Sequence, residues 1–234
     1  MGKKVSTACC SAAELFMTDL CDEEDAEVRC QEWLDRAASA SPQNPEYFRV
    51  LADLRMCQQR PEEARTAVLE AVRWWNAELE AVMNPVEPAD GCELLVELPS
   101  YESRIAGAKI LIEVEELRTA TSLLEQLLRE DDAVLMTWYL LCFALKSLST
   151  GDAEAAEAFK DAIYGSLRVA RREGLFSDPA TLQTDDEILA EILNFAVEAQ
   201  LPLDDLDSLE AEAVEAEALD LEEIIAEAEQ NARE

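Results

Sequence analysis

Apolar residues recur at intervals of three and four along most of the chain, in stretches that short polar segments separate. Such spacing places the apolar side chains on one face of an α-helix. The stretches come in pairs, and the second member of each pair is rich in alanine. The pattern therefore predicts an all-α protein made of helical hairpins.

A period of 34 residues is visible in the first half of the chain. Leu34 and Ala37 are followed 34 positions later by Val68 and Ala71. This is the period of the tetratricopeptide repeat (TPR), in which small residues on the second helix let the two helices of a hairpin approach closely. We expect a TPR solenoid, a superhelix of stacked hairpins whose first helices line the concave face.

Breaks in the helical pattern divide this array. A stretch rich in proline and glycine indicates an inserted connection near residues 84–99. A third hairpin follows it, and then a fourth with Ala156 as its repeat alanine. The last amphipathic stretch, DDEILAEILNFAVEAQ, predicts a helix that caps the solenoid. We therefore expect a TPR-like domain of about four hairpins and a cap over residues 6–200.

The remaining residues, 201–234, are predicted to form an acidic C-terminal tail. From Asp204 onward they include 13 acidic residues and one basic residue, Arg233. Like charges repel, so we expect the tail to be mobile in the free protein and to contact a basic partner. The alternative is that its leucines and isoleucines dock a helix back onto the solenoid as a structural cap.

The charge balance narrows the classes of function. Asp and Glu number 52, Lys and Arg number 19, and the formal net charge is -33. Partners should be neutral or basic, and direct binding of nucleic acid through its phosphates is not expected. Histidine is absent, which excludes His-dependent nucleophiles and His-ligated metals, and the six scattered glycines form no phosphate-binding loop. We expect no enzymatic activity, no cofactor and no metal site.

The seven cysteines are an odd number and form no CxxC pair. They indicate neither disulfides nor zinc, and they favour a reducing, intracellular compartment. No uncharged stretch is long enough to span a membrane, so no membrane partner is expected. One alternative is a lipid-anchored adaptor, because MGKKVS fits a myristoylation motif on Gly2 and the adjacent Cys9 and Cys10 could be palmitoylated. The competing interpretation is that both cysteines pack inside the first helix.

Side chains on the concave face of a TPR array determine what it binds. At the positions of this face, the chain is acidic toward its N-terminal end and apolar and aromatic toward its C-terminal end. An extended basic peptide with an apolar anchor would complement such a surface. The alternative is that the carboxylates are merely solvated and the aromatic rings belong to the core. The predicted binding residues are Asp19, Asp22, Glu23, Glu46, Asp53, Glu102, Glu113, Tyr139 and Phe143.

Another class of TPR protein is a carboxylate clamp, which holds the acidic C-terminal tails of heat-shock chaperones. Such a clamp needs several basic groups along the groove. Here only Arg49, Lys109 and Lys146 occupy groove positions, in a strongly negative chain. The sign of the charge therefore disfavours this interpretation.

Several stretches are more specific than the general TPR pattern, among them DLC, RMCQQRPEEA and the segment from EDD to WYLL. With them, residues 6–172 resemble the TPR-type assembly chaperones of large-subunit ribosomal protein four. The resemblance implies a chaperone, in the cytoplasm and nucleus, that covers a long basic loop of its newly made client until delivery to pre-60S particles. We expect the protein to be a monomer. The resemblance does not determine which repeats bind the client. The alternative function is a generic TPR scaffold or a heat-shock cochaperone that joins other proteins.

Overall fold

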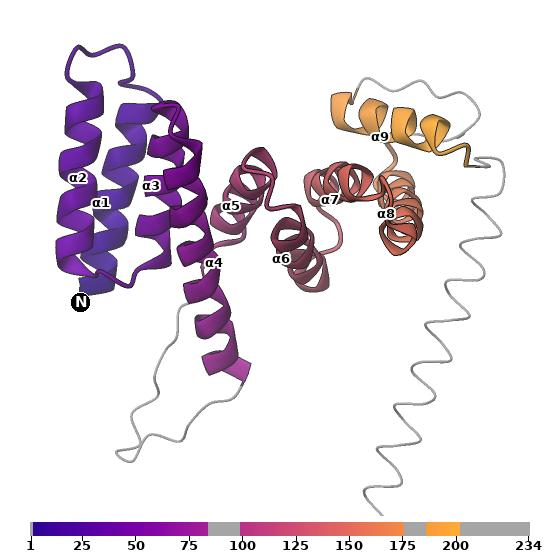
Figure 1. Ribbon diagram of the computed structural model, residues 1–234, viewed down its shortest axis with the longest axis horizontal. Helices are drawn as coiled ribbons and strands as arrows, with labels where there is room; N and C mark the ends of the chain where they lie inside the picture. Colours follow the sequence, from indigo (N-terminus) through magenta and orange to yellow (C-terminus); the bar gives the residue numbers. More distant parts are fainter. Residues whose placement is uncertain (1, 84–98, 176–185, 202–234) are drawn as a thin grey trace, which may run out of the picture. The chain divides into compact units, whose positions relative to one another are not determined.

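The computed structural model describes residues 2–83, 99–175 and 186–201, and over these residues the chain is entirely helical (Figure 1). The prediction of an all-α protein built of TPR-type hairpins is confirmed. The helices are α1 (Gly2–Met17), α2 (Ala26–Ala40), α3 (Pro45–Cys57), α4 (Pro61–Met83), α5 (Tyr101–Glu113), α6 (Leu117–Glu130), α7 (Leu135–Leu148), α8 (Ala153–Arg172) and α9 (Glu187–Glu198).

The chain divides into two units, residues 1–130 and 131–234. In the first unit, α1 packs on α2, α3 on α4 and α5 on α6, which gives three hairpins. The first helices also contact each other, α1 with α3 and α3 with α5 (Figure 1). The three first helices are therefore neighbours, as the repeat period predicts for a TPR array.

Local signals in the sequence set the ends of these helices. Asn44 caps α3 with its side chain, which accepts a hydrogen bond from the N–H of Glu46, and Pro45 occupies the first turn. Ser100 caps α5 in the same way. The short turns after α3 and α5 each place a non-glycine residue in the left-handed region, Gln59 at φ 58° and Glu115 at φ 62°.

The repeat alanines allow close packing within the hairpins of the first unit. Ala64, Ala71 and Ala120 are completely buried. A second close approach joins neighbouring hairpins, because Trp75 of α4 is completely buried and lies directly against Gly107 of α5. A Cβ atom at position 107 would lie 2.6 Å from Cη2 of Trp75, so only glycine fits there.

The second unit contains the fourth hairpin, α7–α8, and the helix α9 that packs against both of its members. The predicted cap is thus present, and its apolar face is buried through Leu189, Ile192 and Leu193. The repeat alanine of α8 differs from the prediction. Ala155 is 8% exposed, whereas Ala156 is only half-buried, because the buried face of α8 is turned by one residue.

Two of the predicted segments lie outside the described residues. They are most of the inserted connection, residues 84–98, and the acidic tail from residue 202 onward. The predicted domain start at residue 6 falls inside α1, which begins at Gly2. None of the helices in the described part of the chain is both long enough and apolar enough to cross a membrane.

Candidate binding groove

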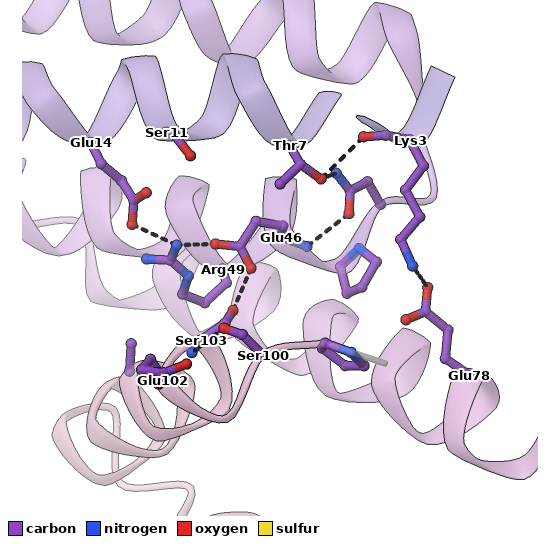
Figure 2. A pocket seen from close by; sticks show the side chains of 14 residues that line it. Lys3, Thr7, Ser11, Glu14, Glu46, Arg49, Glu78, Ser100, Glu102 and Ser103 are labelled. Atoms are coloured by element: carbon purple, nitrogen blue, oxygen red, sulfur yellow. Dashed lines mark hydrogen bonds and ion pairs between the residues drawn. The ribbon is translucent and has the colours of Figure 1, made fainter. Parts of the chain in front are cut away.

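A polar hollow of about 450 Å³ opens in the first unit, between α1, α3, α4 and the start of α5 (Figure 2). We call it the polar groove. Three of its walls come from first helices of hairpins, which is where a TPR array presents its binding surface. Its lining residues are Lys3, Thr7, Ser11, Glu14, Asn44, Pro45, Glu46, Arg49, Glu78, Pro99, Ser100, Glu102, Ser103 and Ala106.

The contribution of α1 is a row of polar side chains on one face of the helix. Lys3, Thr7, Ser11 and Glu14 recur at intervals of four, four and three, so they follow one another in a row along the groove (Figure 2). Cys9 and Phe16, on the opposite side of α1, are buried. The helix is therefore amphipathic, and its polar face lines the groove.

Arg49 of α3 is the centre of the groove's charge network, which we call the Arg49 cluster, made up of Arg49, Glu14, Glu46 and Asp53. Its guanidinium donates hydrogen bonds to Glu14 at 2.6 Å, to Asp53 at 2.7 Å and to Glu46. Arg49 is only 5% exposed. Three carboxylates around one cation leave the cluster with a net negative charge.

The ionisation of the cluster reflects burial as well as pairing. Burial lowers the pKa of Arg49, but the neighbouring Glu46, Glu14 and Asp53 outweigh it and raise that pKa overall, so the guanidinium stays charged. Burial raises the pKa of Asp53 above its ordinary value, although Arg49 opposes the shift. The surplus negative charge of the cluster is therefore held at an energetic cost, which a nearby cation would reduce.

Hydrogen bonds fix the groove walls relative to one another. Asn44 is 1% exposed, and its amide donates to Ser6 at 3.0 Å and to Thr7 at 3.2 Å, which ties α3 to α1. The Ser103 hydroxyl donates to Glu46, which ties α5 to α3. The walls are thus held before any partner arrives, and preorganisation of this kind lowers the cost of binding.

The groove keeps acidic groups that the described part of the chain does not neutralise. Lys3 pairs with Glu78 of α4 at 2.6 Å. Glu102, at the start of α5, is exposed and has no hydrogen bond or ion pair with the part of the chain that the structure describes. With Lys3 paired and Arg49 surrounded, Glu102 is the carboxylate of the groove best placed to meet a cation from a partner.

The structure places the first three predicted residues differently from the sequence analysis. Asp19, Asp22 and Glu23 were expected on the groove face of the first helix, but α1 ends at Met17 and all three lie exposed in the turn that leads to α2. The placement was wrong because the first helix begins at Gly2, several residues earlier than the repeat spacing suggests. These residues do not line the polar groove.

The other predicted carboxylates divide between the groove and its surroundings. Glu46 and Glu102 line the polar groove, as expected. Asp53 lies one turn along α3 and is bound to Arg49. Glu113 lies at the end of α5 and lines a separate hollow with Arg65. The structure therefore brings Glu46, Asp53 and Glu102 into one region and leaves Glu113 apart from it.

The predicted aromatic residues both belong to the second unit. Tyr139 is half-buried, and its ring stacks on that of Phe195 of α9 with centroids 6.0 Å apart. Phe143, one turn further, is 41% exposed and touches Tyr139. Tyr139 is thus partly a core residue, as the alternative interpretation held, whereas Phe143 remains open to a partner.

Several groove residues were missed by the sequence analysis. Thr7, Ser11, Glu14 and Glu78 were not among the predicted residues, and Arg49 was weighed only as a possible anion ligand. The spacing of the first three along α1 was available as a signal, but it required the correct start of the helix. Glu78 belongs to a second helix, which the TPR pattern does not assign to the concave face.

The cysteines of the first helix are placed for packing. Cys9 is 8% exposed and Cys10 is completely buried, and burial raises the pKa of the Cys10 thiol to about 12. A buried, protonated thiol is a poor nucleophile, so the folded hairpin does not present Cys10 for acylation. Among the described residues, no group of three or more Cys, Asp or Glu is arranged to hold a metal ion.

Comparison with known proteins supports the resemblance found in the sequence. No family model matches the chain. Proteins named probable assembly chaperone of rpl4 are similar to it over 139 residues, or 59% of the chain, at 39% identity in Schizosaccharomyces pombe and 33% in Emericella nidulans. A solved structure of an assembly chaperone of RpL4, residues 1–338, matches 66% of the chain and 50% of its own length with a TM-score of 0.53 and 31% identity.

The chain spans only 38% and 32% of the length of these two curated relatives. Over the matched part, the chain is similar to these proteins both in sequence and in its fold of helical hairpins. The resemblance to the assembly chaperones of this ribosomal protein, expected from the sequence, is thus confirmed.

Proposed function

We propose that the chain is a dedicated chaperone of large-subunit ribosomal protein four. In this role it binds an extended basic segment of the newly made client, shields it from aggregation and delivers it to pre-60S ribosome assembly. The similarity to proteins named assembly chaperones of rpl4 supports the identity of the client. The role involves no catalysis and no cofactor, and it places the protein in the cytoplasm and the nucleus.

The observation that carries the mechanism is the unneutralised acidic lining of the polar groove. Four carboxylates, Glu14, Glu46, Glu78 and Glu102, face two cations there. A lysine or arginine of the client that approaches Glu102 adds an ion pair and offsets the negative surplus of the Arg49 cluster. Attraction by the whole acidic chain speeds the encounter, and the groove sets the register of the bound segment.

The same geometry argues against the alternative of a heat-shock cochaperone. Binding of an anionic C-terminus requires basic groups whose charge is available. Arg49 is surrounded by three carboxylates, and Lys146 of the second unit pairs with Glu198. Of the three basic groove positions, only Lys109 is left exposed without a partner in the described part of the chain.

The proposal is tested with purified proteins. The ribosomal protein is diluted from denaturant into buffer with and without the chain, and its aggregation is followed by light scattering at salt concentrations from about 50 to about 500 mM. We expect the chain to keep the client soluble through a stable complex whose affinity falls as salt rises. A small basic globular protein of similar charge serves as the specificity control.

Two results would contradict the proposal. One is continued aggregation of the ribosomal protein at all salt concentrations. The other is preferential binding of a heat-shock chaperone C-terminal peptide when both ligands are present, which would favour the cochaperone alternative.

A further inference from the structure

The second unit contains a basic hollow, which is unexpected in so acidic a chain. Its volume is about 470 Å³, and its lining includes Arg168, Arg171 and Arg172 of α8 with Trp138 and Asp132. We call this site the arginine pocket. Its lining contains three arginines and one acidic residue, whereas acidic residues outnumber basic ones 52 to 19 in the chain as a whole.

Stabilisation of the helix end explains only part of this cluster. Arg171 and Arg172 lie in the last turn of α8, where cations interact favourably with the helix dipole. Arg168 lies one turn earlier, is half-buried and has no hydrogen bond or ion pair with the described residues. The three residues are spaced at i, i+3 and i+4, so their like charges repel along one face.

The wall of the pocket opposite α8 is aromatic. The indole N–H of Trp138 donates to the main-chain oxygen of Asp132 at 2.8 Å, which fixes the orientation of the ring. The ring lies directly against Gly165, where a side chain would displace it. A rigid aromatic wall beside planar guanidinium groups is well suited to hold a carboxylate in place.

The acidic residues in the described part of the chain leave Arg168 without a partner. Asp132 accepts a hydrogen bond from Arg172 at 3.2 Å, and Glu173 lies 3.7 Å from the same side chain. Both contacts involve exposed groups and are individually weak. Neither reaches Arg168, so the pocket retains positive charge for an additional anionic occupant.

We propose that the arginine pocket binds carboxylates of residues 204–234 of the same chain. This segment carries 13 acidic residues against one basic residue, which makes it complementary to the pocket. It begins 32 positions after Arg172, and its covalent attachment gives it a high effective concentration at the pocket. Nucleic acid is the less favourable occupant, because a net charge of -33 repels phosphate at longer range. The inference does not depend on the identity of the client.

Zero-length cross-linking of the full chain tests this contact. A carbodiimide joins a lysine amine to a carboxylate only when the two touch, and the charge-conserving substitution R168K supplies such an amine in the pocket. The matched control is R36K on α2, because Arg36 is an exposed residue but, like Arg168, a helical arginine beside a tryptophan, Trp33. Products are mapped by mass spectrometry, with circular dichroism to confirm folding.

We expect links from position 168 to residues 204–234 to exceed those from position 36 roughly tenfold at low salt, and to decline as salt screens the attraction. Equal yields at the two positions would overturn the proposal. So would links that join only isotopically distinct copies, which would identify a second molecule as the occupant. A separate experiment tests nucleic acid by photo-cross-linking an oligouridylate to the native chain. If cross-links form with the native chain and R168Q abolishes them, the pocket is a nucleic-acid site and the proposal is overturned.

Discussion

The guanidinium of Arg49 hydrogen-bonds to the carboxylate of Asp53, one turn further along α3, at 2.7 Å. The contact joins a cation that is 5% exposed to a carboxylate whose pKa burial raises. Asp53 was predicted from the sequence as a groove residue that meets the client. Its contact with Arg49 shows that its first role is structural, so a substitution there changes folding as well as binding.

Neutralising Arg49 should destabilise the first unit. Arg49→Gln leaves Glu14, Glu46 and Asp53 close together without their shared cation, and loss of one member of a buried ion pair typically costs about 3 kcal/mol. We expect a clear decrease in melting temperature, measured by circular dichroism at low salt. Arg73→Gln is the control, because Arg73 is exposed and pairs with a single carboxylate among the described residues, that of Glu70. Similar melting temperatures for both variants would show that the Arg49 cluster is not a stabilising element.

The contact between Trp75 and Gly107 should respond to added volume. Gly107→Ala places a methyl group 2.6 Å from the indole ring, and overpacking of this kind costs about 1–3 kcal/mol. A smaller partner should relieve the clash, so Trp75→Leu combined with Gly107→Ala should lose less stability than the sum of the single changes. A double-mutant cycle on melting measures this coupling. Strict additivity would contradict the contact.

The sequence predicted the hairpins because their signals are local and periodic. Alanine spacing located the second helices, and the polar turns and the long connection were visible as breaks. The contact of Trp75 with Gly107 was not predictable in the same way, since it joins two hairpins across the inserted connection. The partner of Gly107 follows only from packing in three dimensions.

The candidate site was predicted less well than the fold, for a related reason. Site positions were counted from the expected start of each first helix, and the count failed in the first hairpin, where α1 begins at Gly2. Asp22 consequently lies in a turn. The count succeeded in α3 and at the start of α5, where Asn44 and Ser100 define the helix starts by their caps.

Buried thiols should make the protein sensitive to alkali. Burial raises the pKa of Cys10 and of Cys142 from 9.0 to about 12. Between these two pKa values the thiols of the unfolded chain lose their protons, whereas those of the folded protein keep them. The contribution of these thiols to the free energy of unfolding is therefore fully present below pH 9.0 and is lost as pH rises toward 12. Each unit of difference corresponds to about 1.4 kcal/mol.

The measurement is the melting temperature from pH 8 to about pH 11 for the native chain and for Cys10→Ala. The variant should lose less stability over this range. Cys21→Ala, at an exposed position in the α1–α2 turn, should follow the native curve. Parallel curves for native chain and Cys10→Ala would show that the Cys10 thiol does not contribute.

The two aromatic residues of α7 should separate stability from binding. Tyr139 stacks on Phe195, so Tyr139→Ala should lower the melting temperature as the cap loosens. Phe143 is 41% exposed, so Phe143→Ala should leave melting nearly unchanged. If Phe143 anchors the client, its truncation should raise the Kd for the ribosomal protein by about tenfold or more. A loss of stability in Phe143→Ala without a change in Kd would assign Phe143 to the core.

Client binding by the polar groove depends most directly on Glu102. This carboxylate lines the groove, is exposed and has no partner among the described residues, so its reversal should disturb the fold little. The control is Glu32→Lys, which makes the same change of charge at an exposed position on α2, outside the groove.

The decisive measurement therefore compares three proteins: the native chain, Glu102→Lys and Glu32→Lys. The Kd of each for purified large-subunit ribosomal protein four is measured by calorimetry at about 100 mM salt. We predict that Glu102→Lys weakens binding roughly tenfold while Glu32→Lys changes it about twofold or less. Equal affinities for the two variants would contradict binding of the client in the polar groove.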